Sequence, residues 1–445
     1  MSRDNSRDFP RFPRRSAPPF GHSFDRDNLR DERFRTVLPT NEPKIFDQDA
    51  PEPKIFDQDA PANLELEETI PETHTTPNWL TFGVGDDDIL LPSSRSSNFD
   101  SHALQPQIKN VTTRIWKFKK KDSFNVHGIL CPKIAGACED APPIFITPLS
   151  TTRRPTTIGV LDGMGGAGAG LADFKFRGQS ISASEALLAS RIVRLKVERT
   201  VTAENAITCD GLERAIKEEL RRAESYLKLG EKSRIRGTMT KRLPTTLVVS
   251  QVHDVDSPSG TKIETWWAGD SRAFLITPDD GLGLMTRDHV QTDDPLEQLR
   301  SDPPIENVVN ISTDFYLDEF STNVKGPFLL LLATDGVFGY LPTPGFLELG
   351  LIESLIDSKM GVAEHFAKFC NNYAADDVSA VLLTKGFADD TELKNLFSPR
   401  LDLLRKRYSC LSSMAVDDPG RNAEIERLWA IERTSYLRLS GVTSV

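Results

Sequence analysis

The sequence has few cysteines, and they form none of the spacings that hold a metal through sulfur. There are five, with no C-x-x-C pair and no cysteine–histidine combination that suits a zinc site. The N-terminal residues lack the apolar core of a signal peptide, and no stretch approaches the roughly 18 apolar residues that span a bilayer. We therefore expect reduced thiols and a cytoplasmic protein without a membrane partner.

Positive charge is also scarce. The 445 residues contain 54 lysines and arginines against 65 acidic residues, which gives a net charge of −11. Proteins that bind nucleic acids or membrane surfaces present basic faces, so neither is expected as a partner. The length and the 38% hydrophobic content allow one large domain with extensions, or two domains.

Residues 1–105 are rich in Pro, Asp, Ser, Asn and Arg and contain few aliphatic clusters. They cannot bury enough apolar surface to offset the entropy of ordering, so we predict a disordered tail. The decapeptide Glu-Pro-Lys-Ile-Phe-Asp-Gln-Asp-Ala-Pro occurs twice without change within residues 42–61. It is interpreted as a tandem duplication in a linker, with a doubled docking motif centred on its Ile-Phe pair as the alternative.

From residue 110 the pattern changes to β-branched apolar runs bounded by Gly, Pro and Asp, which predict strands. Two amphipathic segments, 184–200 and 210–229, follow one another among these runs. Strands that flank a helix pair indicate a layered α+β domain, predicted over 110–386, rather than a βαβ repeat. The predicted strands are 112–119, 143–147, 157–161, 245–252, 263–268, 273–277, 328–333 and 378–383.

The remaining predicted helices lie towards the C-terminus. One covers 344–357, with Thr343 as candidate N-cap and Pro344 at its first position. The others are 362–373, 390–404 and 421–437. The last two belong to a helical extension, 387–445, which we expect to pack on the flank of the domain, with a separate partner-binding module as the alternative.

Four acidic motifs stand at the ends of apolar runs although they are far apart in the sequence. They are Glu139-Asp140, Asp162-Gly-Met-Gly-Gly166, Asp335-Gly336 and Asp376-Asp377. Carboxylates gathered at one end of packed strands would suit Mg²⁺ or Mn²⁺, which prefer oxygen ligands. Glycines after Asp162 permit tight backbone geometry, so that a carbonyl oxygen can reach a metal. Since Asp-Gly is also a common turn dipeptide, turn formation is the alternative for any one motif.

In their order along the chain, these motifs and their neighbours resemble those of the metal-dependent protein phosphatase 2C family, in the Asp-Gly-Met-Gly-Gly variant of bacterial-type members. The matching segments are Cys-Glu-Asp-Ala at 138–141, Gly-Val-Leu-Asp-Gly-Met-Gly-Gly at 159–166, Thr-Thr-Leu-Val-Val at 245–249, Ala-Gly-Asp-Ser-Arg-Ala at 268–273, Met-Thr-Arg-Asp-His at 285–289, Leu-Ala-Thr-Asp-Gly-Val-Phe at 332–338 and Asp-Asp-Val-Ser-Ala at 376–380. The resemblance implies a β-sandwich of two antiparallel sheets, with helix pairs packed outside and metals in a cleft at one end.

The resemblance also implies roles for the acidic residues. Asp162, Asp335 and Asp376 would ligate a first metal ion, and Asp162 would share a second ion with the Gly163 carbonyl and with Glu139. These two ions would be Mn²⁺ or Mg²⁺.

Two further aspartates complete the implied site. Asp140 would position a metal-bound water, and Asp270 with Asp335 would form the third metal site of some members. The implied activity is hydrolysis of phosphoserine and phosphothreonine in signalling proteins by a metal-activated water, without a covalent intermediate. This agrees with the sequence, because no cysteine is followed six residues later by the arginine of a C-x₅-R phosphatase loop.

The chain departs from the family pattern at two positions. Met164 replaces a histidine that is a candidate general acid in many members, so metal-bound water would protonate the leaving group. Ala135 replaces an arginine that grips the substrate phosphate. Lys133 is the nearest candidate substitute, but a point charge matches two phosphate oxygens less well, and a solvated loop lysine is the alternative. The missing arginine therefore leaves a second interpretation open, a weakly active or inactive scaffold that binds phosphoproteins.

Partners are inferred from the same features. Phosphoprotein substrates follow from the resemblance, and the N-terminal tail or the C-terminal helices could each dock a further protein. The acidic segment 288–326 corresponds to the variable flap beside the cleft of the family, where substrate selection would reside.

Overall fold

The computed structural model describes residues 79–81, 113–120, 124–134, 138–148, 154–166, 170–176, 179–203, 206–229, 241–253, 260–301, 303–357 and 359–441. Both decapeptides and Ala135 lie outside these ranges. Three residues that the sequence assigned to the disordered tail, Trp79–Thr81, instead pair with a strand of the domain as β1. The rest of the predicted tail falls outside the described residues.

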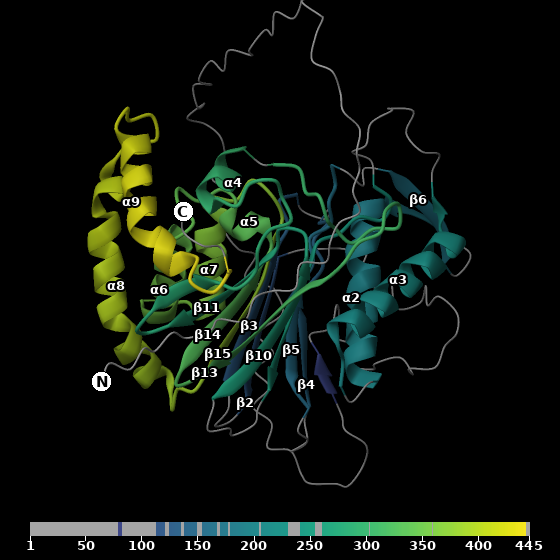
Figure 1. Ribbon diagram of the computed structural model, residues 1–445, viewed down its shortest axis with the longest axis horizontal. Helices are drawn as coiled ribbons and strands as arrows, with labels where there is room; N and C mark the ends of the chain where they lie inside the picture. Colours follow the sequence, from purple (N-terminus) through teal and green to yellow (C-terminus); the bar gives the residue numbers. More distant parts are fainter. Residues whose placement is uncertain are drawn as a thin grey trace, which may run out of the picture. The chain divides into compact units, whose positions relative to one another are not determined.

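Two antiparallel sheets of six strands form the centre of the described part of the chain (Figure 1). The first has the order β1 (Trp79–Thr81), β4 (Ile144–Pro148), β5 (Thr156–Val160), β9 (Leu247–His253), β10 (Thr261–Ala268) and β13 (Asp318–Val324). The second has the order β12 (Gly281–Leu284), β11 (Arg272–Thr277), β14 (Phe328–Ala333), β15 (Val378–Lys385), β3 (Phe124–Cys131) and β2 (Arg114–Lys120). The predicted α+β fold with two antiparallel sheets is therefore confirmed.

Strand β14 explains why the longest apolar run of the sequence is a strand. Phe328, Leu330 and Leu332 face the other sheet and join Phe145, Val160 and other side chains of the core between the sheets. Leu329, Leu331 and Ala333 face the opposite way, into a cluster formed with helices. Side chains alternate across a strand, so a central strand covered on both faces must be apolar at every position.

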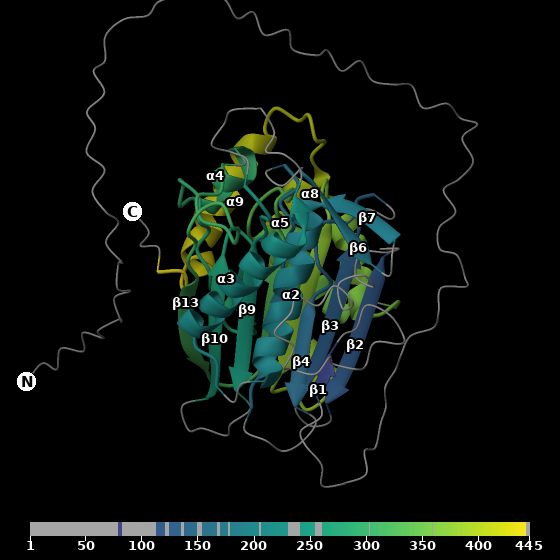
Figure 2. The same cartoon turned by 90° about the vertical axis from the view of Figure 1, so that its right-hand side faces the viewer.

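Helices cover the outer faces of the two sheets. Helices α2 (Glu185–Ala203) and α3 (Cys209–Tyr226) pack on the first sheet, as Figure 2 shows from their side, through a shared apolar cluster. A small sheet of β7 (Gln179–Ser184), β6 (Leu171–Phe176) and β8 (Lys228–Leu229) adjoins them. Helices α6 (Phe346–Ile356) and α7 (Val362–Asn371) pack on the second sheet. The shorter helices are α4 (Pro295–Ser301) and α5 (Asp335–Phe338).

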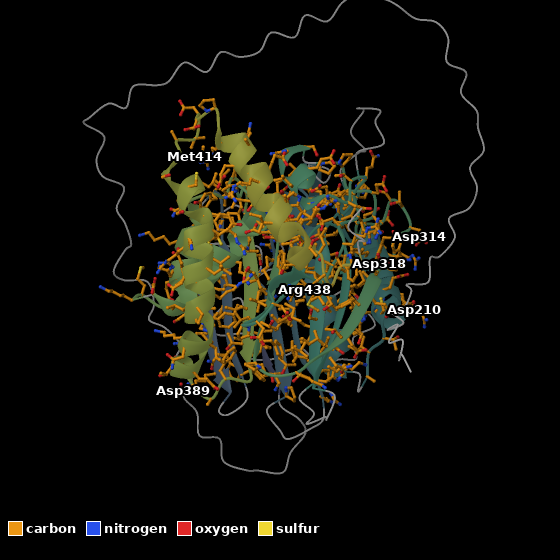
Figure 3. The ribbon with its side chains drawn as sticks, turned by 60° about the vertical axis from the view of Figure 1, so that its left-hand side comes forward. Asp210, Asp314, Asp318, Asp389, Met414 and Arg438 are labelled. Carbon is orange, nitrogen blue, oxygen red and sulfur yellow. The ribbon has the colours of Figure 1, made fainter. Side chains whose placement is uncertain are left out.

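The C-terminal extension forms α8 (Asp390–Ser413) and α9 (Arg421–Tyr436), which lie along the flank of the second sheet. In Figure 3, Asp389 marks the start of α8 and Met414 its end. Leu393, Phe397, Leu401 and Leu404 of α8 are buried in the same cluster as α6. The preferred interpretation of this extension, helices packed on the flank, agrees with these contacts.

The structure corrects three details of the sequence analysis. Strand β3 was not predicted, because Asn125, His127 and Gly128 interrupt its apolar pattern. Strand β13 was missed as well, and it makes the end of the predicted flap segment an edge of the first sheet. Thr343 does not cap α6. The helix begins after Gly345, and the Thr343 hydroxyl hydrogen-bonds instead to the Tyr408 hydroxyl of α8 at 2.9 Å.

No helix in the described ranges is long and apolar enough to cross a bilayer.

Candidate functional site

The predicted acidic residues lie at one end of the two sheets. Asp162 follows β5, Asp335 follows β14 and begins α5, and Asp376 precedes β15. Because neighbouring strands are antiparallel, the end of β14 adjoins the start of β15, and Ala333 pairs with Ala380. Asp270 lies in the turn between β10 and β11, next to the same end of β14. The structure thus brings together motifs that are far apart in the sequence.

Asp162 is held through its backbone by the two threonines that precede strand β9. Its carbonyl oxygen accepts hydrogen bonds from the Thr245 hydroxyl at 2.6 Å and the Thr246 amide at 2.9 Å. Its own amide donates to the Thr246 hydroxyl at 3.2 Å. That hydroxyl is also 2.7 Å from the hydroxyl of Ser271, so the backbone beside Asp270 is tied to the Asp162 turn.

The glycines after Asp162 allow this loop to close around Glu139. A Cβ atom added to Gly163 would lie 2.4 Å from the Glu139 carbonyl oxygen and 2.8 Å from that of Ala186. A Cβ atom added to Gly165 would lie 1.9 Å from Oε2 of Glu139. Gly163 and Gly165 are therefore required by close approach, which explains why glycines follow Asp162 in the sequence.

Glu139 is the most extensively supported of the acidic residues. Its carbonyl oxygen accepts from the Ser190 hydroxyl at 2.6 Å and from Nη1 of Arg191 at 2.5 Å. Its carboxylate Oε1 accepts from the Ser184 hydroxyl at 2.5 Å. Partial burial raises the pKa of the Glu139 carboxyl, and the Ser184 hydrogen bond opposes that rise. Arg191 also donates to the Cys138 carbonyl at 2.8 Å, so α2 fixes the whole Cys138–Glu139 peptide.

Asp377 holds the same segment from the other side. It is buried, and its two carboxylate oxygens accept from the amides of Lys133 at 2.8 Å and Glu139 at 2.7 Å. Gly336 allows this approach, because a Cβ atom there would overlap the Asp377 carbonyl oxygen. Asp377 therefore acts as a backbone anchor. Lys133 is exposed and contributes its amide to this anchor, and its predicted contact with substrate phosphate stays a prediction.

Burial and mutual repulsion raise the pKa values of three aspartates. The pKa of Asp140 is well above the usual range because the carboxyl is buried and because Asp377 and Asp335 are close. The pKa of Asp162 is raised by burial and then by Asp140, Asp335, Asp270 and Asp376. The pKa of Asp270 is raised by burial and then by Asp335. The site is therefore a set of carboxyl groups that repel one another when ionised.

The chemistry of these side chains suits a metal ion, but in this structure the side chains are not close enough together to coordinate one. Oδ1 of Asp270 is buried and has no hydrogen-bond partner within the part of the chain that the structure describes. A carboxylate set with such an orphaned oxygen matches the ligands that Mg²⁺ and Mn²⁺ prefer. As the side chains stand, however, no group of three or more acidic, histidine or cysteine residues in the described ranges could hold a metal ion. A cation would have to draw the carboxylates closer together.

The sequence analysis missed residues that support the predicted site. One is Thr334, whose hydroxyl donates a hydrogen bond to Asp140 at 2.8 Å, and another is Arg191, which lies fully buried behind Glu139. Arg191 could have been noticed, because it interrupts the apolar face of α2 next to Ile192 and Val193. His289 accepts from the Gly269 amide at 3.0 Å and lies 3.0 Å from Asp318, so it supports the turn that carries Asp270.

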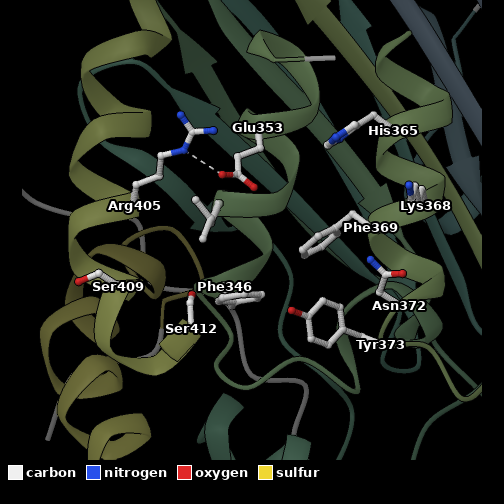
Figure 4. A pocket seen from close by; sticks show the side chains of 11 residues that line it. Phe346, Glu353, His365, Lys368, Phe369, Asn372, Tyr373, Arg405, Ser409 and Ser412 are labelled. Carbon is white, nitrogen blue, oxygen red and sulfur yellow. Dashed lines mark hydrogen bonds and ion pairs between the residues drawn. The ribbon is translucent and has the colours of Figure 1, made fainter. Parts of the chain in front are cut away.

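A cavity of about 440 Å³ lies elsewhere, between α6, α7 and α8. Figure 4 shows the rings of Phe346, Phe369 and Tyr373 along it and the Arg405–Glu353 ion pair at its edge. None of the predicted site residues lines this cavity.

The chain matches no family model and no curated protein. Among solved structures it is similar to the serine/threonine phosphatase Stp1 from Staphylococcus aureus, with 18% identity over 61% of this chain and 93% of that chain and a TM-score of 0.39. It is similar to the serine/threonine phosphatase PstP/Ppp of Mycobacterium tuberculosis, with 15% identity over 59% and 98% and a TM-score of 0.38. It is also similar to RsbX in complex with magnesium, with 12% identity over 62% and 100% and a TM-score of 0.37. At such low identities and TM-scores, the function has to be argued from the site.

Proposed function

We propose that this protein is a metal-dependent phosphoprotein phosphatase of the 2C type, which hydrolyses phosphoserine and phosphothreonine with the help of two Mn²⁺ or Mg²⁺ ions. The observation that carries the proposal is the gathering of acidic side chains at one end of the sandwich, with Asp140 buried and Asp162, Asp270 and Asp335 half-buried. Ionised carboxyl groups repel one another, so such a cluster destabilises a fold unless a cation is bound there. The ordered sequence motifs support the same assignment.

Each acidic residue has a proposed part in this reaction. Asp162, Asp335 and Asp376 would hold one ion, and Asp162, the Gly163 carbonyl and Glu139 a second, with Asp270 available for a third. The bound ions would supply a nucleophilic water and neutralise the phosphate oxygens. Asp140 would orient the attacking water, because the Thr334 hydroxyl fixes one of its carboxylate oxygens at 2.8 Å.

The test is the substitution of single carboxylates. Asp162→Asn and Asp335→Asn should each abolish Mn²⁺-dependent hydrolysis of a phosphopeptide and of an aryl phosphate. Each substitution removes a negatively charged ligand from the proposed two-metal site. Asp402→Asn is a matched control, because Asp402 is exposed on α8 and far from the site in sequence. Undiminished turnover in Asp162→Asn would refute the proposed site.

A second candidate function is a phosphoprotein-binding scaffold with little or no turnover. Ala135 favours it, since the usual phosphate-gripping arginine is missing. Calorimetric titration of Mn²⁺ together with a hydrolysis assay separates the two functions. Metal binding without turnover would favour the scaffold. We also propose a cytoplasmic location and docking partners for the terminal segments.

A further inference from the structure

Arg272 occupies a position between two of the proposed metal ligands. It begins β11, two residues after Asp270, and pairs with Ala333 of β14, two residues before Asp335. Only 1% of its surface is exposed. A buried guanidinium needs a hydrogen-bond acceptor for each of its N–H groups, because an unsatisfied charged donor is strongly unfavourable.

The acceptors of Arg272 come from three separate elements. Asp288 accepts from Nε at 3.1 Å and from Nη2 at 2.7 Å, and Gln298 of α4 accepts from Nη2 at 2.6 Å. The Tyr436 hydroxyl, near the end of α9, accepts from Nη1 at 3.2 Å. The C-terminal extension thus completes the hydrogen bonding of a residue inside the domain.

The guanidinium also contacts the helix that carries Asp335. Its central carbon lies 4.3 Å from the centroid of the Phe338 ring, a cation–π arrangement. Phe338 is the last residue of α5, which begins at Asp335. The orientation of Arg272 is therefore linked to Asp270 through β11 and to Asp335 through α5.

Helix α9 holds Tyr436 in place by packing and by polar contacts. The Tyr436 ring meets the rings of Phe274 and Trp429 edge-on, at centroid distances of 6.1 and 5.4 Å. Trp429 donates from Nε1 to Asp294 at 3.0 Å, immediately before α4. Helix α9 therefore supports Arg272 directly through Tyr436 and indirectly through α4, which supplies Gln298.

We propose that Tyr436 is a positioning residue for the carboxylate site, which it supports by fixing Arg272 and, through Arg272 and Phe338, the helix that begins with Asp335. This inference rests on the proposed metal-dependent function. Residues that hydrogen-bond directly to metal ligands commonly change metal affinity by about 10- to 100-fold when they are replaced, and Tyr436 acts through one further residue, so we expect the lower end of that range. On this basis the C-terminal helices help to position the proposed metal ligands, in addition to packing on the second sheet.

The minimal variant is Tyr436→Phe, which removes only the hydroxyl. Its matched control is Tyr408→Phe, which removes an equally buried hydroxyl from α8. The Tyr408 hydroxyl donates to Glu432 at 2.6 Å and contacts Thr343, and it has no contact with Arg272. Both variants of the full chain should lose thermal stability, so a difference between them reports on Arg272.

Two measurements are compared between these variants. Mn²⁺ affinity, measured by calorimetry, should fall by about 10-fold in Tyr436→Phe and stay unchanged in Tyr408→Phe, with kcat at saturating Mn²⁺ lowered in the first variant only. Hydrogen exchange in the metal-free protein should be faster in Tyr436→Phe at the amides of Val337 and Gly339, which bond to the carbonyls of Thr334 and Asp335.

The outcomes separate this inference from the proposed function. Equal effects of the two variants on Mn²⁺ affinity and on exchange in α5 would overturn the role of Tyr436 while leaving the phosphatase proposal intact. If the unaltered protein neither binds Mn²⁺ nor hydrolyses phosphate, the proposed function fails. In that case hydrogen exchange at the amides of Val337 and Gly339 still tests whether Tyr436 positions α5. Unchanged exchange in Tyr436→Phe would show that it does not.

Discussion

Replacing Gly165 by alanine tests how the glycine loop shapes the site. The added Cβ would lie 1.9 Å from Oε2 of Glu139, whereas real Cβ atoms essentially never approach closer than 3.0 Å. The difference between these distances requires the carboxylate to retreat by about 1.1 Å, away from the 2.5 Å hydrogen bond that the Ser184 hydroxyl donates to Oε1. The backbone itself can accept alanine, since Gly165 is not among the glycines with positive φ.

The variant is therefore expected to fold but to lose function. Loss of one hydrogen bond to a half-buried carboxylate lowers the free energy of unfolding by about 1.5 to 3 kcal/mol. A misplacement of about 1 Å in a catalytic group can lower the rate by about 100-fold. Displaced Glu139 should also weaken the second metal site, so that Mn²⁺ affinity falls by about 10-fold or more.

The adjacent glycine provides the control. No atom of the described residues lies within 4 Å of a Cβ added to Gly166. Gly166→Ala should thus retain turnover and Mn²⁺ binding, measured by aryl phosphate hydrolysis and calorimetry, while Gly165→Ala loses both. If the two variants bind Mn²⁺ and turn over equally well, the loop does not place Glu139 as the structure indicates, and this reasoning is wrong.

Two further predictions concern the anchor and the protons of the site. Asp377→Ala removes the acceptor of the Lys133 and Glu139 amides, and in urea unfolding of the metal-free protein it should lower the free energy of unfolding by about 3 kcal/mol; a loss below about 1 kcal/mol would contradict the anchor. The pKa values of Asp140 and Asp162 are raised above the ordinary 3.8, so the folded state holds protons that the unfolded state has lost, and the metal-free protein should become less stable as pH rises above about 4. Over the same pH window Mn²⁺ affinity should increase, because the cation competes with those protons. Stability in a chelator that rises with pH would contradict this sign.

The parts of the fold that follow from local pattern were predictable. Strand β14 was predicted with its observed bounds, because a run of six apolar residues between turn signals suits a strand buried on both faces. Strand β3 was not, since its polar and glycine positions are acceptable only between the neighbouring strands β2 and β15. Such positions depend on tertiary neighbours, which a single sequence does not reveal.

The candidate site likewise contains residues that local sequence identifies and residues that depend on tertiary neighbours. Asp162 and Asp335 could be identified because each follows a strand and precedes a glycine. The supporting residues are harder to identify. Arg191 interrupts the apolar face of α2 but nothing nearby indicates its partner Glu139, and Thr334 has no local signature at all. The resemblance gives a role to Asp376 and none to its neighbour Asp377. The two amides that Asp377 anchors belong to the segment around Glu139, whose fold a single sequence does not reveal.

The way in which the acidic residues are held favours a cation site over a purely structural role. Asp162 is fixed through its amide and carbonyl groups, and Glu139 likewise, so the fold positions these residues largely through their backbones. Asp270 keeps a buried carboxylate oxygen that lacks a partner among the described residues. A scaffold would be more stable with an amide or apolar side chain at that position, because an unpaired buried carboxylate is unfavourable. The cluster therefore destabilises the metal-free fold, and a bound cation would relieve that repulsion.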